Sequence, residues 1–171
     1  RVVQANQWPA DIFVSIHCNA FTDPAAHGME VYTTPGQGPS DQLATAVIDE
    51  IATEFPELTL RADQSDGDRD KESNFYVIRK TSMPAILVEM AFISNPTEEQ
   101  LLVSPSGQYR FAQAIARGIL KYIGVPTATP PVRIKAGGQV WEATIIDGRS
   151  HTQVRQLAEA LGHKVTWDEA T

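Results

Sequence analysis

The segment Asp11-Ile12-Phe13-Val14-Ser15-Ile16-His17 is the most informative part of the sequence about the fold. Its β-branched and aromatic side chains do not alternate cleanly with polar ones, which is typical of a parallel strand covered on both faces. Residues 85–90, directly after Pro84, are a second stretch of this kind. Residues 28–33 are a further strand candidate and end at Pro35-Gly36. These patterns predict a central sheet of short, buried strands.

A helix is predicted between residues 33 and 57. Ser40 is a suitable N-terminal cap for it. Apolar residues recur at helical spacing from Leu43 to Phe55, and Pro56 ends the pattern. Residues 57–74 are polar and acidic, which indicates a loop.

The alternation of strands and helices continues beyond this loop. Residues 75–78 are a short strand candidate, ahead of the strand at residues 85–90. A last helix opens near Ser106, keeps apolar side chains on one face as far as Ile123, and ends at Gly124. Strands that alternate with helices predict an α/β domain, with a mostly parallel central sheet flanked by helices.

The chain changes character after Gly124. Residues 125–131 contain three prolines in seven residues, which favours an extended, semi-rigid linker. We therefore expect one domain at residues 1–124 and a small α+β unit at residues 132–171. The elements predicted for the small unit are strands at 132–136 and 140–146 around a Gly137-Gly138 turn, a helix at 154–161 and a strand at 164–167.

The net charge of −7 comes from 14 basic and 21 acidic side chains. A nucleic-acid-binding protein usually carries a basic patch, so this class of protein is disfavoured. Residues 1–131 hold 9 basic and 16 acidic side chains, whereas residues 132–171 hold 5 of each, which agrees with two different units. No apolar run approaches the roughly 20 residues needed to cross a bilayer, so we expect no membrane span.

The single cysteine, Cys18, allows no disulfide bond within the chain. Adjacent residues on a strand point to opposite faces, so Cys18 is expected to point away from His17. We interpret Cys18 as a small, buried apolar side chain. Such sparse cysteine usage fits a cytosolic protein and an exported bacterial protein equally well.

Two side chains near the ends of predicted strands could carry chemistry. His17 ends the first strand, and ligand sites in open α/β sheets gather at the carboxyl ends of strands. Glu89 interrupts an apolar strand, although carboxylates are rarely buried unless they are paired or bind a metal. The alternatives are a buried, hydrogen-bonded histidine and a buried ion pair of Glu89 with Arg61 or Arg79. If both residues are functional, His17 would be a metal ligand and Glu89 an acid/base. Together they would form half of a metallohydrolase site.

The other polar candidates have weaker patterns. His27, His151 and His163 have no specific motif around them and are interpreted as surface histidines. The acidic segment at residues 63–72 suggests a calcium loop, but it lacks the glycine that the motif requires at its sixth position. A solvated loop is therefore the favoured interpretation of this segment.

Five segments occur in a specific order and spacing along residues 1–124. They are residues 10–20 around Ser15-Ile16-His17-Cys18-Asn19, residues 28–32, residues 76–79, residues 83–89 ending in Glu89, and Phe92-Ile93-Ser94-Asn95-Pro96. Together they resemble the zinc-dependent N-acetylmuramoyl-L-alanine amidases of bacteria and their phages.

The resemblance implies a central sheet flanked by helices. It also implies cleavage of the amide bond between the lactyl group of muramic acid and L-alanine in peptidoglycan. His17 would be a ligand of a catalytic Zn²⁺ ion, and Glu89 would be the catalytic acid/base that acts on a zinc-activated water. Asn19 and Arg79 lie in matching segments and are candidate substrate-binding residues.

One departure from the family pattern concerns the metal. Family members supply two further zinc ligands, a histidine in a Gly-His-Gly-Gly-type turn and a glutamate, from a segment that precedes the one matching residues 1–6. We therefore expect this chain to be the C-terminal part of a catalytic domain, with Arg1 as a cut point, and to be inactive as given. We also expect one flank of the sheet to be exposed, which is an aggregation hazard.

The tail resembles a different family. Residues 147–168 look like the small domain first named from the N-terminus of copper amine oxidases, and this name implies no copper site here. We expect residues 132–171 to be such a domain, cut short after Trp167.

The function favoured by these resemblances is a monomeric amidase that acts on peptidoglycan outside the cell, as a secreted or cell-wall protein of a bacterium or as a phage lysin. A non-catalytic cell-wall binding protein with the same groove is one alternative. A different zinc hydrolase on a similar scaffold is another. Retention of Glu89 favours the amidase over the binding protein, because simple binding has no need of a buried glutamate there.

Overall fold

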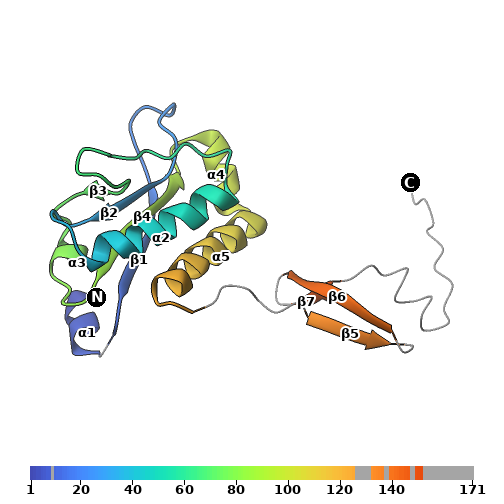
Figure 1. Ribbon diagram of the computed structural model, residues 1–171. Coiled ribbons are helices and arrows are strands. Elements are labelled where there is room, and N and C mark those ends of the chain that lie inside the picture. Colours follow the sequence, from blue (N-terminus) through green and yellow to red (C-terminus); the bar gives the residue numbers. More distant parts are fainter. Residues whose placement is uncertain (9, 126–131, 137–138, 147–148, 152–171) are drawn as a thin grey trace. The chain divides into compact units, whose positions relative to one another are not determined.

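The computed structural model describes residues 1–8, 10–125, 132–136, 139–146 and 149–151. The chain divides into two compact units, Arg1–Thr127 and Ala128–Thr171 (Figure 1). The described elements of the first unit are α1 (Val2–Gln7), β1 (Phe13–Asn19), β2 (Glu30–Thr33), α2 (Pro39–Glu54), β3 (Lys71–Glu72), α3 (Tyr76–Arg79), β4 (Ala85–Phe92), α4 (Pro96–Val103) and α5 (Pro105–Tyr122).

The four strands of the first unit form one mixed sheet in the order β1-β4-β2-β3. β4 pairs with β1 in parallel and with β2 in antiparallel orientation, and β3 pairs with β2 in parallel. The predicted α/β architecture is therefore confirmed, and most of its strand pairings are parallel. The reversal of β2 relative to β4 was not predicted, because strand direction depends on pairings between distant segments.

One face of the sheet is covered by α2 and α5, which lie side by side in Figure 1. Ile86 and Val88 of β4 point to this face and pack in a core with apolar residues of both helices. Phe55 stacks on Phe111 in the same core, with ring centroids 4.0 Å apart. Burial of this apolar surface is the main term that stabilises the unit.

The opposite face of the sheet is covered only in part. Ile78 of α3 packs there against Ala85 and Leu87 of β4, and Phe13 of β1 packs against this small cluster. These residues lie toward the beginning of β1 and β4. His17 and Glu89, nearer the carboxyl ends of the same strands, lie on this less covered face.

Helix starts differ from the sequence predictions by one or two residues. α2 begins at Pro39 with Gly38 as its N-cap, and the Ser40 hydroxyl instead accepts a hydrogen bond of 3.1 Å from the backbone N–H of Ala85. α5 begins at Pro105, because the side chain of Ser104 accepts from the backbone N–H of Gly107. In both helices a proline occupies the first turn, where its missing N–H is tolerated.

The strand predicted at residues 75–78 is wrong. The chain forms a single helical turn there, Tyr76–Arg79, which buries Ile78 and leaves Tyr76 exposed. Periodicity cannot distinguish a strand from a helical turn over so short an apolar run. The loop predicted for residues 57–74 is also interrupted, since Lys71 and Glu72 pair with β2 as the short strand β3.

The interpretation of Cys18 as a buried side chain is wrong as well. Its side chain is exposed. β1 lies at one end of the strand order, so among the described strands it has a neighbour on one side only. The sequence pattern predicts a strand covered on both faces, whereas Ile16, His17 and Cys18 near its end are exposed.

The described part of the second unit is a small antiparallel sheet in the order β5-β6-β7. β5 (Val132–Ala136) and β6 (Gln139–Ile146) confirm the two predicted strands, and β7 (Arg149–His151) was not predicted. The Gly137-Gly138 turn, the linker residues 126–131, the helix at 154–161 and the strand at 164–167 lie outside the described residues. Among the helices that are described, none has the length and apolar character required to cross a membrane.

Candidate active site

Three strands bring His17, Glu89 and Glu30 into one row. His17 of β1 lies directly opposite Glu89 of β4, and Glu30 of β2 lies directly opposite Glu89 on the other side. Side chains that are paired in register point to the same face of a sheet. The row lies at the carboxyl ends of β1 and β4, which is where ligand sites of such sheets gather.

His17 is exposed, so the alternative of a buried histidine is wrong. Its Nε2 atom lies 2.9 Å from the Oγ atom of Ser15, which is two residues earlier on the same strand and buried. This hydrogen bond restrains the orientation of the imidazole ring. An exposed, oriented imidazole is suited to bind a metal or to move a proton.

Glu89 is partly buried, and its Oε2 atom is buried with no hydrogen-bond partner among the described residues. Burial, and then the charge of Glu30, raise the pKa of Glu89 to about 7. The alternative of an ion pair is not supported, because Arg61 pairs with Glu30 and the described ion pairs include none with Glu89. A carboxyl group with a pKa near neutrality can both donate and accept a proton at physiological pH.

Glu30 was given no role from the sequence, yet it is the most strongly held side chain of the row. It is 3% exposed and forms ion pairs with Arg61 and with Lys71, whose Nζ atom lies 3.1 Å from Oε1. The Tyr32 hydroxyl and the Asn19 amide donate to its Oε2 atom. Burial would raise the pKa of Glu30, but the hydrogen bonds from Tyr32 and from the two cationic side chains outweigh it and lower this pKa. Glu30 is therefore a fixed negative charge beside Glu89.

A cavity of about 480 Å³ opens beside Glu30. Asn19, Phe21, His27, Arg61 and Lys71 are among the residues that line it. Of the two candidate substrate-binding residues, Asn19 thus lies in the cavity and contacts Glu30. Arg79 lies elsewhere, exposed at the end of α3 and outside the lining of this cavity.

The loop between β1 and β2, which forms one wall of the cavity, is tied to the start of α4. Glu98 of α4 is buried and accepts hydrogen bonds of 2.7 Å from the backbone N–H groups of Gly28 and Phe92. The Asn95 amide donates to the carbonyl oxygens of Pro24 and Ala26. These contacts position the wall relative to the end of β4.

The described residues fit part of a zinc site. A catalytic zinc ion takes about three protein ligands and keeps one open position. His17 offers one nitrogen, and the unpartnered oxygen of Glu89 faces the same side of the sheet. Glu30 is unsuited as a ligand because cations and hydrogen-bond donors already occupy its oxygens. Within the described part of the chain, the one cluster of three potential ligand side chains lies elsewhere, at Asp41, Asp68 and Asp70.

Known proteins resemble this unit in sequence and in fold. A family model described as N-acetylmuramoyl-L-alanine amidase matches residues 1–121. The N-acetylmuramoyl-L-alanine amidase AmiC of Neisseria meningitidis serogroup B is 35% identical over 159 residues, which cover 72% of this chain and 38% of AmiC. An uncharacterized cell wall amidase of Bacillus anthracis is 36% identical over 124 residues, which cover 71% of this chain and 23% of that protein.

Among solved structures, the catalytic domain of CwlV, an N-acetylmuramoyl-L-alanine amidase from Paenibacillus polymyxa, is similar with a TM-score of 0.64 and 36% identity. The similarity covers 73% of this chain and 64% of the CwlV chain. The chain therefore spans well under half the length of the two curated relatives and about two thirds of this catalytic domain.

Proposed function

This chain belongs to the N-acetylmuramoyl-L-alanine amidase family, and from that premise we propose that residues 1–124 are part of a catalytic domain that hydrolyses peptidoglycan. The bond cleaved is the amide between the lactyl group of N-acetylmuramic acid and L-alanine. The observation that carries the proposal is the pairing of His17 with Glu89 at the carboxyl ends of two parallel strands. It puts an imidazole and a carboxyl group on the same side of the sheet, as the proposed metal ligand and acid/base require.

His17 would hold a zinc ion through an imidazole nitrogen. A bound zinc ion would polarise the amide carbonyl and make a water molecule a stronger nucleophile. Because the described residues offer this one ligand, we propose that the remaining ligands come from outside them. The chain by itself is then expected to bind zinc weakly and to hydrolyse little.

Glu89 would move the protons of the reaction. Its carboxylate takes a proton from the attacking water as the new C–O bond forms, and it delivers a proton to the alanine nitrogen as the C–N bond breaks. The products are a free lactyl carboxylate and a free amino group on L-alanine. A pKa of about 7 suits both halves of this task, and the fixed negative charge of Glu30 helps to keep it there.

The substrate would bind along the cavity beside this row. Asn19 offers an amide that could contact the peptide or the sugar, since it lines the cavity next to Glu30. We propose Arg79 as a second, more distant contact, because it is exposed on the face of the sheet that carries Glu89.

We propose that the protein works as a monomer in the cell wall, outside the membrane, where its substrate lies. The name of the Bacillus anthracis relative, a cell wall amidase, supports this location. The small unit would be an appended domain of the kind first named from copper amine oxidases, and its antiparallel strands are compatible with a separate small fold. Whether the amidase is a host autolysin or a phage lysin makes no difference to the chemistry.

The experiment uses a chimera in which residues 1–121 replace the matching region of the CwlV catalytic domain. On purified peptidoglycan, the chimera is expected to release free alanine amino groups, and the chain alone is expected to release few. Glu89→Gln in the chimera should lower the rate by about 100-fold or more, since acid–base catalysis commonly contributes that much. His17→Ala should lower bound zinc, measured by atomic absorption.

Glu99→Gln, an exposed change on α4, is the matched control and should leave the rate unchanged. Release of reducing sugars in place of alanine amino groups would identify another hydrolase. A folded, zinc-loaded chimera that binds peptidoglycan without cleaving it would favour the non-catalytic binding protein. An unaltered rate in Glu89→Gln would contradict the proposed mechanism.

A further inference from the structure

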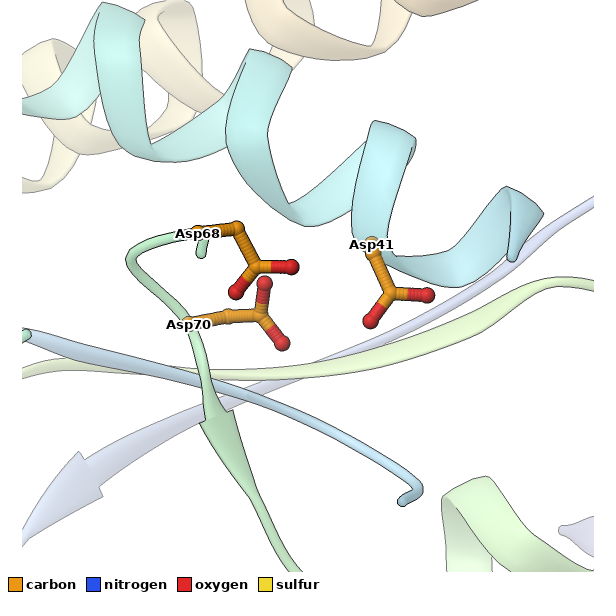
Figure 2. A group of neighbouring side chains, drawn as sticks. All are labelled: Asp41, Asp68 and Asp70. Carbon is orange, nitrogen blue, oxygen red and sulfur yellow. The ribbon is translucent and has the colours of Figure 1, made fainter. Parts of the chain in front are cut away.

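Three aspartates meet at the other end of β2 from Glu30. Asp41 belongs to the first turn of α2, Asp68 to the loop before β3, and Asp70 directly precedes β3. Each offers a carboxylate oxygen, and these oxygens lie within 4.8 Å of one another. Figure 2 shows the three carboxylates gathered between α2 and the segment that leads into β3. The cluster is separate from the His17–Glu89–Glu30 row, since Thr33, which contacts it, ends the strand that Glu30 begins.

Asp41 and Asp70 are buried and Asp68 is partly buried. The backbone N–H of Gly38 donates to Asp41 Oδ2, and the Gln37 amide donates to Asp68 Oδ2 at 2.9 Å, but these donors do not reach every carboxylate oxygen. Asp70 is 2% exposed and Asp41 is 6% exposed. The Oδ1 atoms of Asp68 and Asp70 are buried and have no partner among the described residues. The Thr33 hydroxyl lies 2.5 Å from Asp70 Oδ2 and 3.4 Å from Asp41 Oδ1, but it has a single proton to donate. A buried carboxylate oxygen without a partner is costly, so it indicates a missing ligand or proton.

Cationic side chains near the cluster are engaged elsewhere. Arg69 and Lys121 both pair with Asp49, and within the described part of the chain no ion pair includes Asp41, Asp68 or Asp70. Burial, with the charges of Asp68 and Asp41, raises the pKa of Asp70 to about 7. The three carboxylates thus repel one another, and either a proton or a cation has to offset that repulsion.

We propose that Asp41, Asp68 and Asp70 bind a calcium ion. An all-oxygen, anionic set of ligands is what calcium prefers, whereas zinc favours nitrogen and sulfur. Two oxygens that each lie about 2.4 Å from one ion can be up to about 4.8 Å apart, so the cluster has suitable dimensions. A cavity of about 660 Å³ reaches Asp41 and Asp68 and has room for the waters that would complete the coordination.

Such an ion would fasten the loop before β3 to the start of α2. The same loop begins near Arg61 and ends at Lys71, the two cations that hold Glu30 in the candidate active site. Calcium at the aspartates would therefore stabilise the fold and restrain the segment that carries these cations. The inference does not depend on the proposed amidase activity, because its test measures binding and unfolding.

The first measurement is calorimetric titration of the EGTA-treated full chain with CaCl₂, followed by thermal unfolding. One calcium ion per chain is expected to bind. At 5 mM CaCl₂ the Tm should rise by roughly 5 °C relative to the EGTA-treated protein, because a ligand that binds only the folded state stabilises it. Terbium, a luminescent stand-in for calcium, should be sensitised by Tyr122, which lines the same cavity, and calcium should displace it.

Asp70→Asn is expected to change the Tm differently in the absence and in the presence of calcium. Without calcium it should raise the Tm, because it removes a buried negative charge, and it should abolish the rise in Tm on adding calcium. Asp68→Asn should weaken calcium binding at least tenfold and provides a second variant if Asp70→Asn folds poorly. Asp63→Asn, an exposed aspartate of the same loop, is the control and should keep the full calcium response.

A shared proton is the competing explanation of the cluster. It predicts no heat of calcium binding at millimolar concentration and a Tm of the full chain that is the same with calcium and with EGTA. Either result would overturn the proposal, as would an equal calcium response in the full chain and Asp70→Asn. Equal binding of magnesium would show a divalent site without the inferred preference for calcium.

Discussion

Three glutamates in or near the His17–Glu89–Glu30 row have different hydrogen-bond and ion-pair partners, and these partners decide the role of each side chain. Glu30 is buried among cations and stays ionised. Glu98 is buried with two backbone N–H groups as donors and serves to hold a loop. Glu89 has a buried oxygen without a donor, and its pKa is raised to about 7. From the sequence, only Glu89 stood out, because it interrupts the longest apolar strand.

The raised pKa of Glu89 makes stability depend on pH. Between about pH 4.5 and pH 7 the folded chain keeps the Glu89 proton while the unfolded chain has lost it. The folded state binds more protons in this window, so its stability falls as the pH rises and is lowest, for this group, above pH 7. Each pKa unit corresponds to about 1.4 kcal/mol, so the interval from pH 4.5 to pH 7 would give roughly 3.5 kcal/mol. Glu89 is only partly buried, and solvent screening reduces the expected loss to on the order of 2 kcal/mol.

Urea unfolding at several pH values from 5 to 8, in the presence of EDTA, measures this effect. In Glu89→Gln, the unfolding free energy should decrease between pH 5 and pH 8 by about 2 kcal/mol less than in the unaltered protein. Asp70 contributes in the same direction and remains in both proteins, so the difference between them isolates Glu89. Glu99→Gln serves as the control and should keep the fall. A curve for Glu89→Gln that parallels the unaltered protein would contradict a raised pKa.

At the scale of elements, the crossing of α2 and α5 depends on one glycine. A Cβ atom at Gly118 of α5 would lie 2.6 Å from the Cα atom of Val47 and 2.9 Å from the carbonyl oxygen of Ala46 in α2. The backbones of the two helices approach so closely that no side chain fits between them. The apolar pattern predicted both helices but not this contact. Periodicity shows which face of a helix is buried, but it does not show how closely two helices approach each other.

Gly118→Ala is expected to destabilise the fold although alanine is the better helix former. Helix propensity alone would favour the alanine by about 1 kcal/mol. Overpacking against backbone atoms should cost more and give a net loss of about 1–3 kcal/mol in unfolding free energy. Chemical denaturation measures the sign directly. Ala116→Gly, at an exposed position of the same helix, calibrates propensity without a packing change, and a stabilised Gly118→Ala would contradict the close approach.

α4 and α3 differ in how far the local sequence determines their conformation. α4 was not predicted, yet its start carries a plain signal, because the Asn95 side chain accepts from the backbone N–H groups of Thr97 and Glu98 and Pro96 follows it directly. The helical turn Tyr76–Arg79 has no comparable signal, and its packing on β4 decides its conformation.

At the scale of the whole molecule, β1 is an edge strand of the four-stranded sheet that the structure describes. It pairs with β4 on one side, and among the described strands none pairs with its other side. Ile16 of this strand is 51% exposed, and Trp8 and Phe21 nearby in the chain are 69% and 62% exposed. A strand edge with exposed apolar side chains is a template for pairing with another chain. The expected exposed flank of the sheet therefore coincides with the strand that carries His17.

Ile16→Lys should reduce association of the chain at high concentration. A lysine on an edge strand repels a second copy and removes apolar surface. Light scattering over a concentration series should show a rising apparent mass for the unaltered chain and a smaller rise for Ile16→Lys. Val103→Lys, which adds the same charge at an exposed apolar position of α4, is the control. An equal effect of both variants would indicate a change in net charge as the cause.

The amino-acid sequence alone was enough to predict β1, β2, β4 and the two long helices, and to single out His17 and Glu89 as candidate site residues. Each of these rests on a local pattern, since apolar periodicity and strand-end position act over a few neighbouring residues. No local pattern predicts that Glu30 lies beside Glu89, that Arg61 pairs with Glu30, or that Asp41 lies close to Asp68 and Asp70. Pairing across strands and packing of helices create these contacts between distant segments. The acidic segment at residues 63–72 was interpreted from its sequence as a solvated loop. Asp70 of this segment is nevertheless buried, because α2 and β2, which lie outside the loop, cover it.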